Sequence, residues 1–542
     1  MNQTANAEPV QPSLNLNLNH HPNPKTQIRN AVKDEMPKYL LGLDSGSTAT
    51  KAVIFDTIGR TVAVGSRRVE QRQPRPRHVE RDMQETWAAA AGAIRDALEQ
   101  SQIPASAIAA VGVTGHGDGL YLVDQEGAPL GPGILSLDSR AFDVREQWRE
   151  TGVLQQALEL TGQQPYPYAA VSLLKWIQVN EPERYAKIGH VLFCKDWLRL
   201  CLTGVPATDP TEASSSFTDV RTQQYSAEVL ELYSLASIAP ALPPIIPSEA
   251  PAGRITAHAA AQTGLIEGTP VACGLHDVTS SALGMGNTEP GIVSITAGTF
   301  SINEILSDRP QLDPRWSCRN GTRPGQWMNM SISPASSSNV DWFLREFFAH
   351  EAQQAAERGC SLFDLIGDEL QAAFAEPSSV MFHPFLFGSP FEQPASASFF
   401  GIRGWHRRAH LARAVLEGMV FNHRYHVEAL TSALPARRAG LTGGGSSSPM
   451  LAQLFSDTLG IPIDIPENQE ASALGAALCA GVSAGAFASL AEAATRACRI
   501  QRSHQPDPQR HAQLTEAYTL YMQLISNMNP LWPALDRAAT AH

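Results

Sequence analysis

Apolar residues along the chain fall into short runs broken by glycine-containing turns, a pattern typical of buried strands in an α/β protein. Runs of this kind predict strands at 39–43, 52–56, 61–69 and 108–113, with the second and third at hairpin spacing. Between the third and fourth strands, residues 84–100 repeat apolar positions every three or four residues and predict an amphipathic helix. The first part of the chain therefore predicts a sheet with a helix packed against it.

A second set of elements in the same order begins near Gly291. One strand ends in a glycine turn at 294–299, another ends at Leu441 before three consecutive glycines, and a helix of small residues spans about 472–482. Strand, turn, strand and helix in both halves favour a duplicated α/β fold with its boundary near 286–290, rather than a solenoid of short repeats.

The two glycine turns, at 41–48 and 294–299, carry hydroxyl residues beside the glycines. Glycine lets backbone N–H groups approach a phosphate closely, and serine and threonine hydroxyls add donors. One such turn alone would be equally well explained as a β-turn with a solvated Asp44. Two of them, far apart in the chain, predict two halves that hold one polyphosphate from opposite sides. In that arrangement Asp44 is placed to hold Mg²⁺, directly or through water, and Lys51 to offset negative charge.

Asp277 is the most informative single carboxylate in the chain. It follows a predicted strand at 271–275 and opens a helix of small residues at 278–284. A carboxylate in that place can cap the helix, which is worth about 1 kcal/mol, or it can accept the proton of a hydroxyl that attacks a γ-phosphate. The sequence allows both roles at once.

Three further groups of polar residues lie at the ends of predicted strands. The run 442–448 places three glycines between a strand and a helix, which favours a flat surface for a nucleobase or ribose over a flexible linker. His116 and Asp118 alternate with glycines and are predicted to reach ligand hydroxyls, with a surface turn as the simpler alternative. Asp138 and Arg140 follow another apolar run and either lie near the same site or form a structural ion pair.

Bulk composition limits the classes of function. At 542 residues, with 43% hydrophobic and 17% charged residues, the chain is long enough for two or more domains of ordinary globular composition. A formal net charge of −12 argues against nucleic acid as a partner, and no apolar run in the sequence approaches the roughly 20 residues of a membrane span. Seven cysteines without CxxC spacing or histidine pairing are predicted to be buried, reduced thiols of a cytoplasmic protein.

The two ends of the chain differ from the rest. Residues 1–37 are rich in Asn, Gln, Pro and His and contain no apolar segment of the kind found in secretory signals, so a disordered tail is expected. The two domains are expected at 38–287 and 288–530, followed by a C-terminal tail at 531–542.

Together these segments resemble the FGGY carbohydrate kinases, a family within the actin, hexokinase and Hsp70 ATPase superfamily. The resemblance covers roughly residues 38–525, nearly the whole chain outside the N-terminal tail. It implies a two-domain α/β ATPase fold, made of duplicated ribonuclease H-like domains with a cleft between them. The stretches that carry it are, in chain order, 44–51, 78–82, 195–198, 274–277, 296–299, 397–402 with 410–411 and 414–417, and 442–445.

The resemblance further implies ATP-dependent phosphorylation of a sugar or polyol hydroxyl with the help of Mg²⁺. Asp277 falls on the catalytic base and Asp44 on the aspartate that holds Mg²⁺ and phosphate. The family closes its two domains over the substrate, which keeps water from the γ-phosphate. The acceptor is expected to contact His116, Gly117, Asp118, Ser136 and Asp277, and the nucleotide to contact Ser47, Thr48, Lys51, Gly298, Thr299, Gly443, Gly444 and Ser446.

Departures from the family pattern concern the acceptor. Gly117 and Asp118 stand where glycerol kinases carry an Arg-Glu pair, and Ser136 stands where they carry a tryptophan. The sequence His-Gly-Asp-Gly at 116–119 also differs from the Gln-Met-His-Gly that is usual in D-xylulose kinases. Glycerol and D-xylulose are therefore weaker candidates.

Other segments favour particular acceptors. The stretches 135–138 and 171–176 look most like L-xylulose kinases, whereas 116–119 and 207–212 lean toward erythritol kinases. A ketopentose, L-xylulose above all, is the expected acceptor. Erythritol or another polyol, and D-xylulose, are the alternatives.

Two other classes of protein are compatible with such a fold. A chaperone- or actin-like ATPase would hydrolyse ATP without a sugar, and a catalytically silent sugar sensor would lack turnover. The segment 397–417, which fits the kinase family position by position, argues against the first, and the intact Asp44, Asp277 and Thr299 argue against the second. The expected partner is a small sugar or polyol, without nucleic acid or membrane. The oligomeric state stays open, with a homodimer as one expectation.

Overall fold

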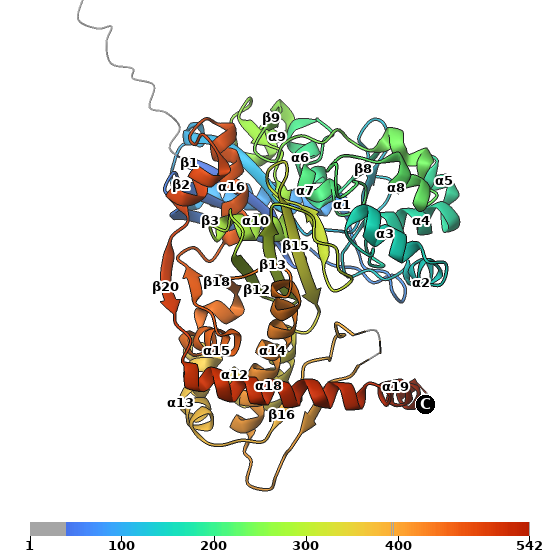
Figure 1. Ribbon diagram of the computed structural model, residues 1–542. Coiled ribbons are helices and arrows are strands. Elements are labelled where there is room, and N and C mark those ends of the chain that lie inside the picture. The colour runs from blue at the N-terminus through green and yellow to red at the C-terminus, as the bar shows by residue number, and fades with distance from the viewer. Residues whose placement is uncertain (1–38, 392, 394, 541–542) are drawn as a thin grey trace, which may run out of the picture. The chain divides into compact units, whose positions relative to one another are not determined.

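A computed structural model describes residues 39–391, 393 and 395–540, so the N-terminal tail predicted at 1–37 lies outside the described residues. The described part contains two large mixed sheets with helices packed on their faces (Figure 1). The prediction of a two-domain α/β fold is confirmed.

The first sheet has the strand order β3-β2-β1-β5-β10-β9, with β11 paired to the end of β5. Strands β1, β2 and β3 form an antiparallel meander, and β5 runs parallel to both β1 and β10. Its strands are β1 (Tyr39–Ser45), β2 (Ala49–Asp56), β3 (Thr61–Arg68), β5 (Ile108–Gly115), β9 (Pro251–Arg254), β10 (Pro270–Ala272) and β11 (Leu275–His276).

The second sheet has the order β14-β15-β13-β12-β18-β19-β20. Strands β12, β13 and β15 form an antiparallel meander, and β18 runs parallel to β12 and β19. The series β15-β13-β12-β18-β19 thus repeats β3-β2-β1-β5-β10 in order and direction, which is the predicted duplication of a ribonuclease H-like unit. Its strands are β12 (Ile292–Ala297), β13 (Ser301–Ser307), β14 (Ser317–Asn320), β15 (Trp327–Ser333), β18 (Arg438–Gly443), β19 (Ile463–Pro466) and β20 (Ile500–His504).

Both glycine turns occupy the same place in their sheets. Residues 46–48 connect β1 to β2, and residues 298–300 connect β12 to β13. The pairing next to each turn is also equivalent, with Ser45 opposite Thr50 and Ala297 opposite Ser301. The duplication therefore delivers two matched turns.

Helix α16 (Ala471–Ser483) comes late in the chain but packs on the first sheet. A Cβ on Gly42 of β1 would lie 1.9 Å from a carbonyl oxygen of this helix, and one on Gly112 of β5 would lie 1.8 Å from another. Glycine at both positions lets helix and strands touch directly. Helices α16 and α17 (Leu490–Ala497) share one hydrophobic core with β1, β2 and β5, so the core of the first sheet extends beyond the predicted boundary at 287.

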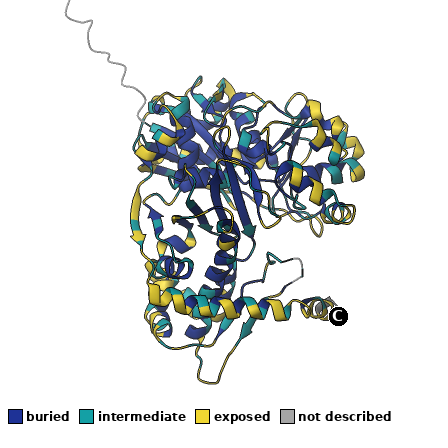
Figure 2. Cartoon of the chain, viewed as in Figure 1, coloured by how far each residue is buried: buried dark blue, intermediate teal, exposed yellow. Residues whose placement is uncertain are grey.

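The remaining helices complete the layers. Helix α1 (Met83–Ser101) packs on the face of the first sheet opposite α16, and α14 (Arg408–Thr431) packs with α11, α15 and α18 in the core of the second. Figure 2 shows the strands as largely buried, whereas α18 exposes much of its surface.

None of the described helices combines the length and hydropathy needed to cross a membrane. Further helices are α2 (Phe142–Glu150), α3 (Val153–Thr161), α4 (Ala170–Asn180), α5 (Pro182–Tyr185), α6 (Cys194–Thr203), α7 (Pro210–Ala213), α8 (Ala227–Leu232), α9 (Ala257–Thr263), α10 (Asp277–Gly284), α11 (Ser337–Phe347), α12 (Ala349–Arg358), α13 (Leu362–Ala375), α15 (Pro449–Leu459) and α18 (Pro508–Met528).

The segment expected as a C-terminal tail is helical through residue 540. Helix α19 (Trp532–Thr540) begins with a tryptophan that is fully buried. The Trp532 ring contacts those of Phe385 and Phe391, with centroids 6.1 and 6.4 Å apart. Burial of one large aromatic side chain thus fixes the start of this helix against the second half of the chain.

Candidate active site

One cavity of about 290 Å³ gathers residues from both glycine turns and from the end of β5. Its lining contains Asp277, the acceptor-side residues His116, Gly117, Asp118 and Ser136, and the turn residues Gly46, Ser47, Gly298 and Thr299. The turn residue Phe300 forms an apolar wall with three residues of the second sheet, Ile302, Met330 and Ile332. A larger cavity of about 460 Å³, lined mainly by α13, α14 and α18, contains none of the predicted site residues.

The predicted residues Asp44, Thr48, Lys51, Gly443, Gly444 and Ser446 lie outside this lining. Lys51 is engaged elsewhere, because its Nζ lies 2.8 Å from both carboxylate oxygens of Glu470, just before α16. Burial raises the pKa of Asp44 to about 6, an effect strengthened by Glu470 and opposed by Lys51. The first turn is therefore flanked by two carboxylates and one ammonium group.

The carbonyl oxygens of the first turn are bonded from inside the protein. Arg81 is fully buried and donates to the carbonyl oxygen of Gly46 at 3.2 Å and to that of Ser47. Gln71 also donates to the Ser47 carbonyl. These contacts fix the shape of the turn and engage acceptors that would repel a phosphate.

The second turn is held in the same way by the start of α11. Ser337 donates to the Gly298 carbonyl through its backbone N–H at 2.9 Å and its hydroxyl at 2.6 Å, and Ser338 donates to the Thr299 carbonyl at 3.2 Å. The two turns thus share both their sheet position and the manner in which their carbonyl groups are satisfied.

The third glycine cluster follows β18, beside the second turn. Gly443 has φ of +90° and pairs with Ala297, whose carbonyl oxygen would lie 2.6 Å from a Cβ at position 443. Glycine is required there for both reasons. The Ser446 hydroxyl donates to the Gly443 carbonyl at 2.8 Å and to Gln469 at 3.2 Å, so in this structure it stabilises the turn itself.

Asp277 is the first residue of α10, and its Oδ1 accepts the N–H of the adjacent Val278 at 2.8 Å. The helix N-cap is His276, so Asp277 does not cap the helix through its side chain. Burial raises the pKa of Asp277 to about 7, together with the nearby carboxylates of Asp44 and Asp118 and against the N–H groups of Val278 and Gly117. A carboxylate titrating near neutral pH in a cavity is suited to proton transfer.

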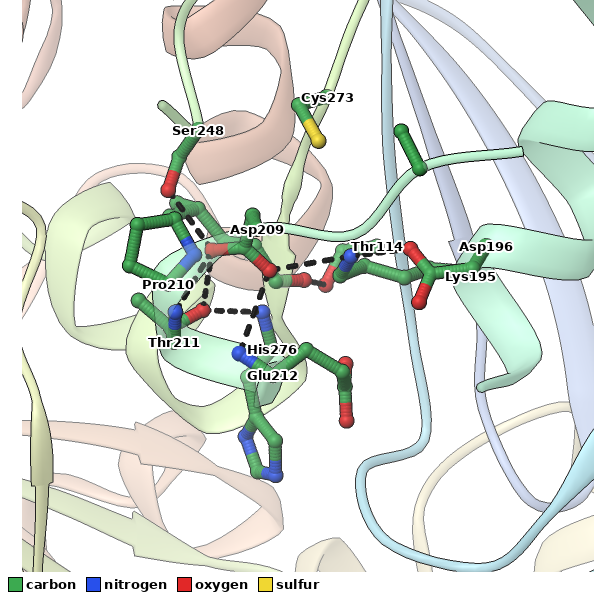
Figure 3. A network of polar contacts seen from close by, with 12 residues as sticks. Thr114, Lys195, Asp196, Asp209, Pro210, Thr211, Glu212, Ser248, Cys273 and His276 are labelled. Atoms are coloured by element: carbon green, nitrogen blue, oxygen red, sulfur yellow. Dashed lines mark hydrogen bonds and ion pairs between the residues drawn. The ribbon is translucent and has the colours of Figure 1, made fainter. Parts of the chain in front are cut away.

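A buried ionic network anchors the strand that delivers Asp277 (Figure 3). The backbone N–H of His276 donates to the Thr211 hydroxyl at 2.9 Å, and that hydroxyl donates to Asp209 at 2.6 Å. Asp209 also lies 3.0 Å from Lys195, which contacts Asp196 at 2.6 Å. All four network side chains are nearly or fully buried, so losing one partner would leave an uncompensated charge.

The acceptor side of the cavity contains the polar side chains of His116, Asp118 and Ser136, and a glycine, Gly117, that no larger residue could replace. His116 Nε2 lies 3.0 Å from the Tyr121 hydroxyl, and burial, then the nearby Arg81, lowers the pKa of His116 to about 3. A Cβ on Gly117 would lie 1.9 Å from Nε2 of His276, so only glycine leaves room for this ring. Ser136 lines the cavity as predicted.

Asp138 and Arg140 form a structural pair. The guanidinium of Arg140 binds both oxygens of Asp138 at 2.8–3.1 Å and also reaches Glu80 at 2.7 Å. Asp138 further accepts the backbone N–H of Val79 at 2.7 Å. Neither residue lines the cavity, which favours the structural alternative for this pair.

Two buried ionisable residues near the site have no signal in the local sequence. Arg319 of β14 lies 3.1 Å from the Asp118 carboxylate, and Glu304 of β13 carries an Oε1 without a hydrogen-bond partner among the described residues. Burial and the nearby Asp277 raise the pKa of Glu304 to about 8. Both residues reach the site from the second sheet, and no local motif indicates this.

Comparison with known proteins gives a consistent result. Residues 39–284 match the N-terminal domain, and residues 293–484 the C-terminal domain, of the FGGY family of carbohydrate kinases. The chain is 34% identical over 504 residues to the probable L-xylulose kinase of Pasteurella multocida, covering 91% of this chain and 99% of that protein. It is 33% identical to the L-xylulose/3-keto-L-gulonate kinase of Escherichia coli (91% and 97% covered) and 30% identical to the erythritol kinase of Brucella abortus (92% and 97%). Among solved structures, xylulose kinase from Rhodospirillum rubrum superposes with a TM-score of 0.80 at 28% identity, covering 91% of this chain and all of that one (100%).

Proposed function

Because the chain belongs to the FGGY family of carbohydrate kinases, and is therefore a sugar kinase, we propose that it transfers the γ-phosphoryl group of ATP to a hydroxyl of L-xylulose or a closely related ketopentose. The single observation that carries this proposal is the cavity in which Asp277 and both glycine turns meet. The names of the relatives at 32–34% identity support L-xylulose as the acceptor.

In the proposed mechanism, Asp277 removes the proton from the attacking hydroxyl. Its pKa of about 7 lets the carboxylate be ionised before the reaction and still accept a proton during it. His116 and Asp118 bind the other hydroxyls of the acceptor, and the apolar wall around Ile302 excludes water from the reacting groups. Backbone N–H groups of the two turns stabilise charge on the phosphoryl group.

The residues around the first turn fit a magnesium ion. No cluster of three or more His, Cys, Asp or Glu side chains suited to a metal is present among the described residues. Mg²⁺ with few protein ligands is usual when substrate phosphates and water complete its shell. Asp44 would hold it, since the pKa of this carboxylate is raised by burial and by Glu470, and a nearby cation would relieve both effects. When bound, the ion neutralises charge on the phosphates.

The proposal is tested by ADP release measured with a panel of acceptors: L-xylulose, D-xylulose, L-ribulose, erythritol and glycerol. L-Xylulose is expected to give the highest kcat/KM. A higher kcat/KM with erythritol than with L-xylulose would identify a polyol as the acceptor, in line with the name of the relative at 30% identity. ATP hydrolysis that is unchanged by every acceptor would contradict a kinase and favour a chaperone- or actin-like ATPase.

A further inference from the structure

Arg319 connects the second sheet to the acceptor side of the cavity. It lies on β14, yet its Nη2 is 3.1 and 3.3 Å from the two oxygens of Asp118. Its Nη1 is 3.1 Å from Nε2 of His276, and its Nε donates to Gln163 at 2.9 Å. Each guanidinium nitrogen therefore has a partner from the first half of the chain.

The contact with His276 fixes the protonation state of that ring. A guanidinium group only donates hydrogen bonds, so Nε2 of His276 must accept and carries no proton. Burial and the adjacent Arg319 keep the pKa of His276 well below its ordinary value, so the ring is neutral and its proton is on Nδ1. Nδ1 lies 3.3 Å from Oδ1 of Asp277.

The His276 ring therefore lies beside the Asp277 carboxylate. Oδ1 accepts the N–H of Val278 at 2.8 Å, and Nδ1 of His276 lies near the same oxygen without a hydrogen bond to it in this structure. Contacts of this length often shorten when substrate binds.

The contact with Asp118 has a separate consequence. The Asp118 side chain is only 7% exposed and has φ of +56°, a strained backbone conformation for an aspartate. Arg319 pairs with it from a position that is equally buried (6% exposed). Without that partner, Asp118 would be a buried and unpaired carboxylate, so its side chain would be expected to leave its present position.

We propose that Arg319 is a positioning residue for the acceptor: it fixes the His276 ring beside Asp277 and holds the Asp118 carboxylate in place for a substrate hydroxyl. This inference rests on the proposed kinase function and extends it to a residue of the second sheet. It predicts that the residue matters for the acceptor and much less for the nucleotide.

The test compares Arg319→Gln with Arg323→Gln, a matched control in the turn after the same strand. The Arg323 side chain is 53% exposed and makes only long contacts of 3.5 and 3.8 Å. Arg319→Gln is expected to lower kcat/KM for the sugar by about 100-fold or more, the usual effect of truncating one partner of a buried charged pair, with the KM for ATP changed less than about threefold. The control is expected to behave as the wild type.

Two further variants extend the test, and the first of them, Arg319→Lys, keeps it decisive if Arg319→Gln does not fold. Arg319→Lys retains the charge, but its single ammonium group cannot reach Asp118 and His276 in the same geometry, so an intermediate loss of kcat/KM for the sugar is expected. Asp118→Asn removes the carboxylate that Arg319 holds. In that background, the loss of kcat/KM for the sugar caused by Arg319→Gln should be about tenfold smaller than in the wild type.

The inference is overturned if Arg319→Lys has the same kcat/KM for the sugar as the wild type. It is also overturned if Arg319→Gln raises the KM for ATP as much as the KM for the sugar. A third contrary result is a double variant, Asp118→Asn with Arg319→Gln, whose loss of kcat/KM equals the product of the two single losses. These results differ from failure of the proposed function, in which the wild type itself phosphorylates none of the acceptors.

Discussion

Asp277→Asn is the substitution in which catalysis and stability are expected to change in opposite directions. Asparagine has the same size and keeps the oxygen that accepts the Val278 N–H at 2.8 Å, but it cannot take a proton from a substrate hydroxyl. Loss of a general base usually lowers turnover by about 10²–10⁴-fold. The same change also removes a carboxylate whose ionisation the folded protein opposes.

The magnitude follows from the pKa, which burial raises from 3.8 to about 7. Three units correspond to about 4 kcal/mol at 1.36 kcal/mol each. The side chain is 30% exposed, so solvent screening reduces the expected effect to about 1–2 kcal/mol. Below the unfolded pKa near 4, both states are protonated and no penalty exists. The penalty grows as pH rises from 4 to 7 and is complete above 7.

The assay pairs sugar-dependent ADP release with thermal unfolding at pH 8 and pH 5. Asp277→Asn is expected to lose turnover and to raise Tm at pH 8 by about 1–2 °C, with a smaller gain at pH 5. Asp143→Asn is a suitable control, because the Asp143 side chain is 85% exposed. Near-normal turnover would refute the assignment of the base. A lower Tm at pH 8 would refute the electrostatic reasoning.

Three further outcomes are expected. As the pH is lowered through about 7, the kcat/KM for the sugar should decrease, because Asp277 has a raised pKa of about 7 and gains its proton there. A pH-rate profile that stays flat from pH 8 to pH 5.5 would contradict this. Gly117→Ala places a methyl group 1.9 Å from Nε2 of His276, so it should lower kcat/KM for the sugar by at least tenfold and leave the KM for ATP nearly unchanged. Equal effects on both substrates would argue against an acceptor site here. Thr211→Val removes the hydroxyl between the His276 N–H and Asp209 and should destabilise the protein by about 1–3 kcal/mol; an unchanged Tm would show that the network does not support this strand.

The elements of the site that depend on local sequence could be predicted. Each glycine turn lies between two strands that are neighbours in the chain, so the spacing of apolar residues was enough to place Gly46 and Gly298. Asp277 was found for the same reason, because it sits where a strand passes directly into a helix.

Features that depend on contacts between distant segments could not be predicted. Arg319 reaches Asp118 only because β14 lies at the edge of the second sheet beside the first half of the chain, and its surroundings in the sequence resemble an ordinary strand. Lys51 was expected beside phosphate, but its ammonium group binds Glu470, a residue that precedes a helix packed on the first sheet. That helix, α16, lies in the segment 288–530 yet covers the first sheet, and sequence order alone does not reveal which sheet a small-residue helix will cover.

The central claim is that the two glycine turns and Asp277 form one site that moves a phosphoryl group from ATP to a sugar. The most direct test is ³¹P NMR of the wild-type protein with Mg²⁺, ATP and L-xylulose. A sugar phosphomonoester signal that grows in equal amount with ADP is the predicted result. Inorganic phosphate as the product, at a rate that does not depend on the sugar, would contradict the account.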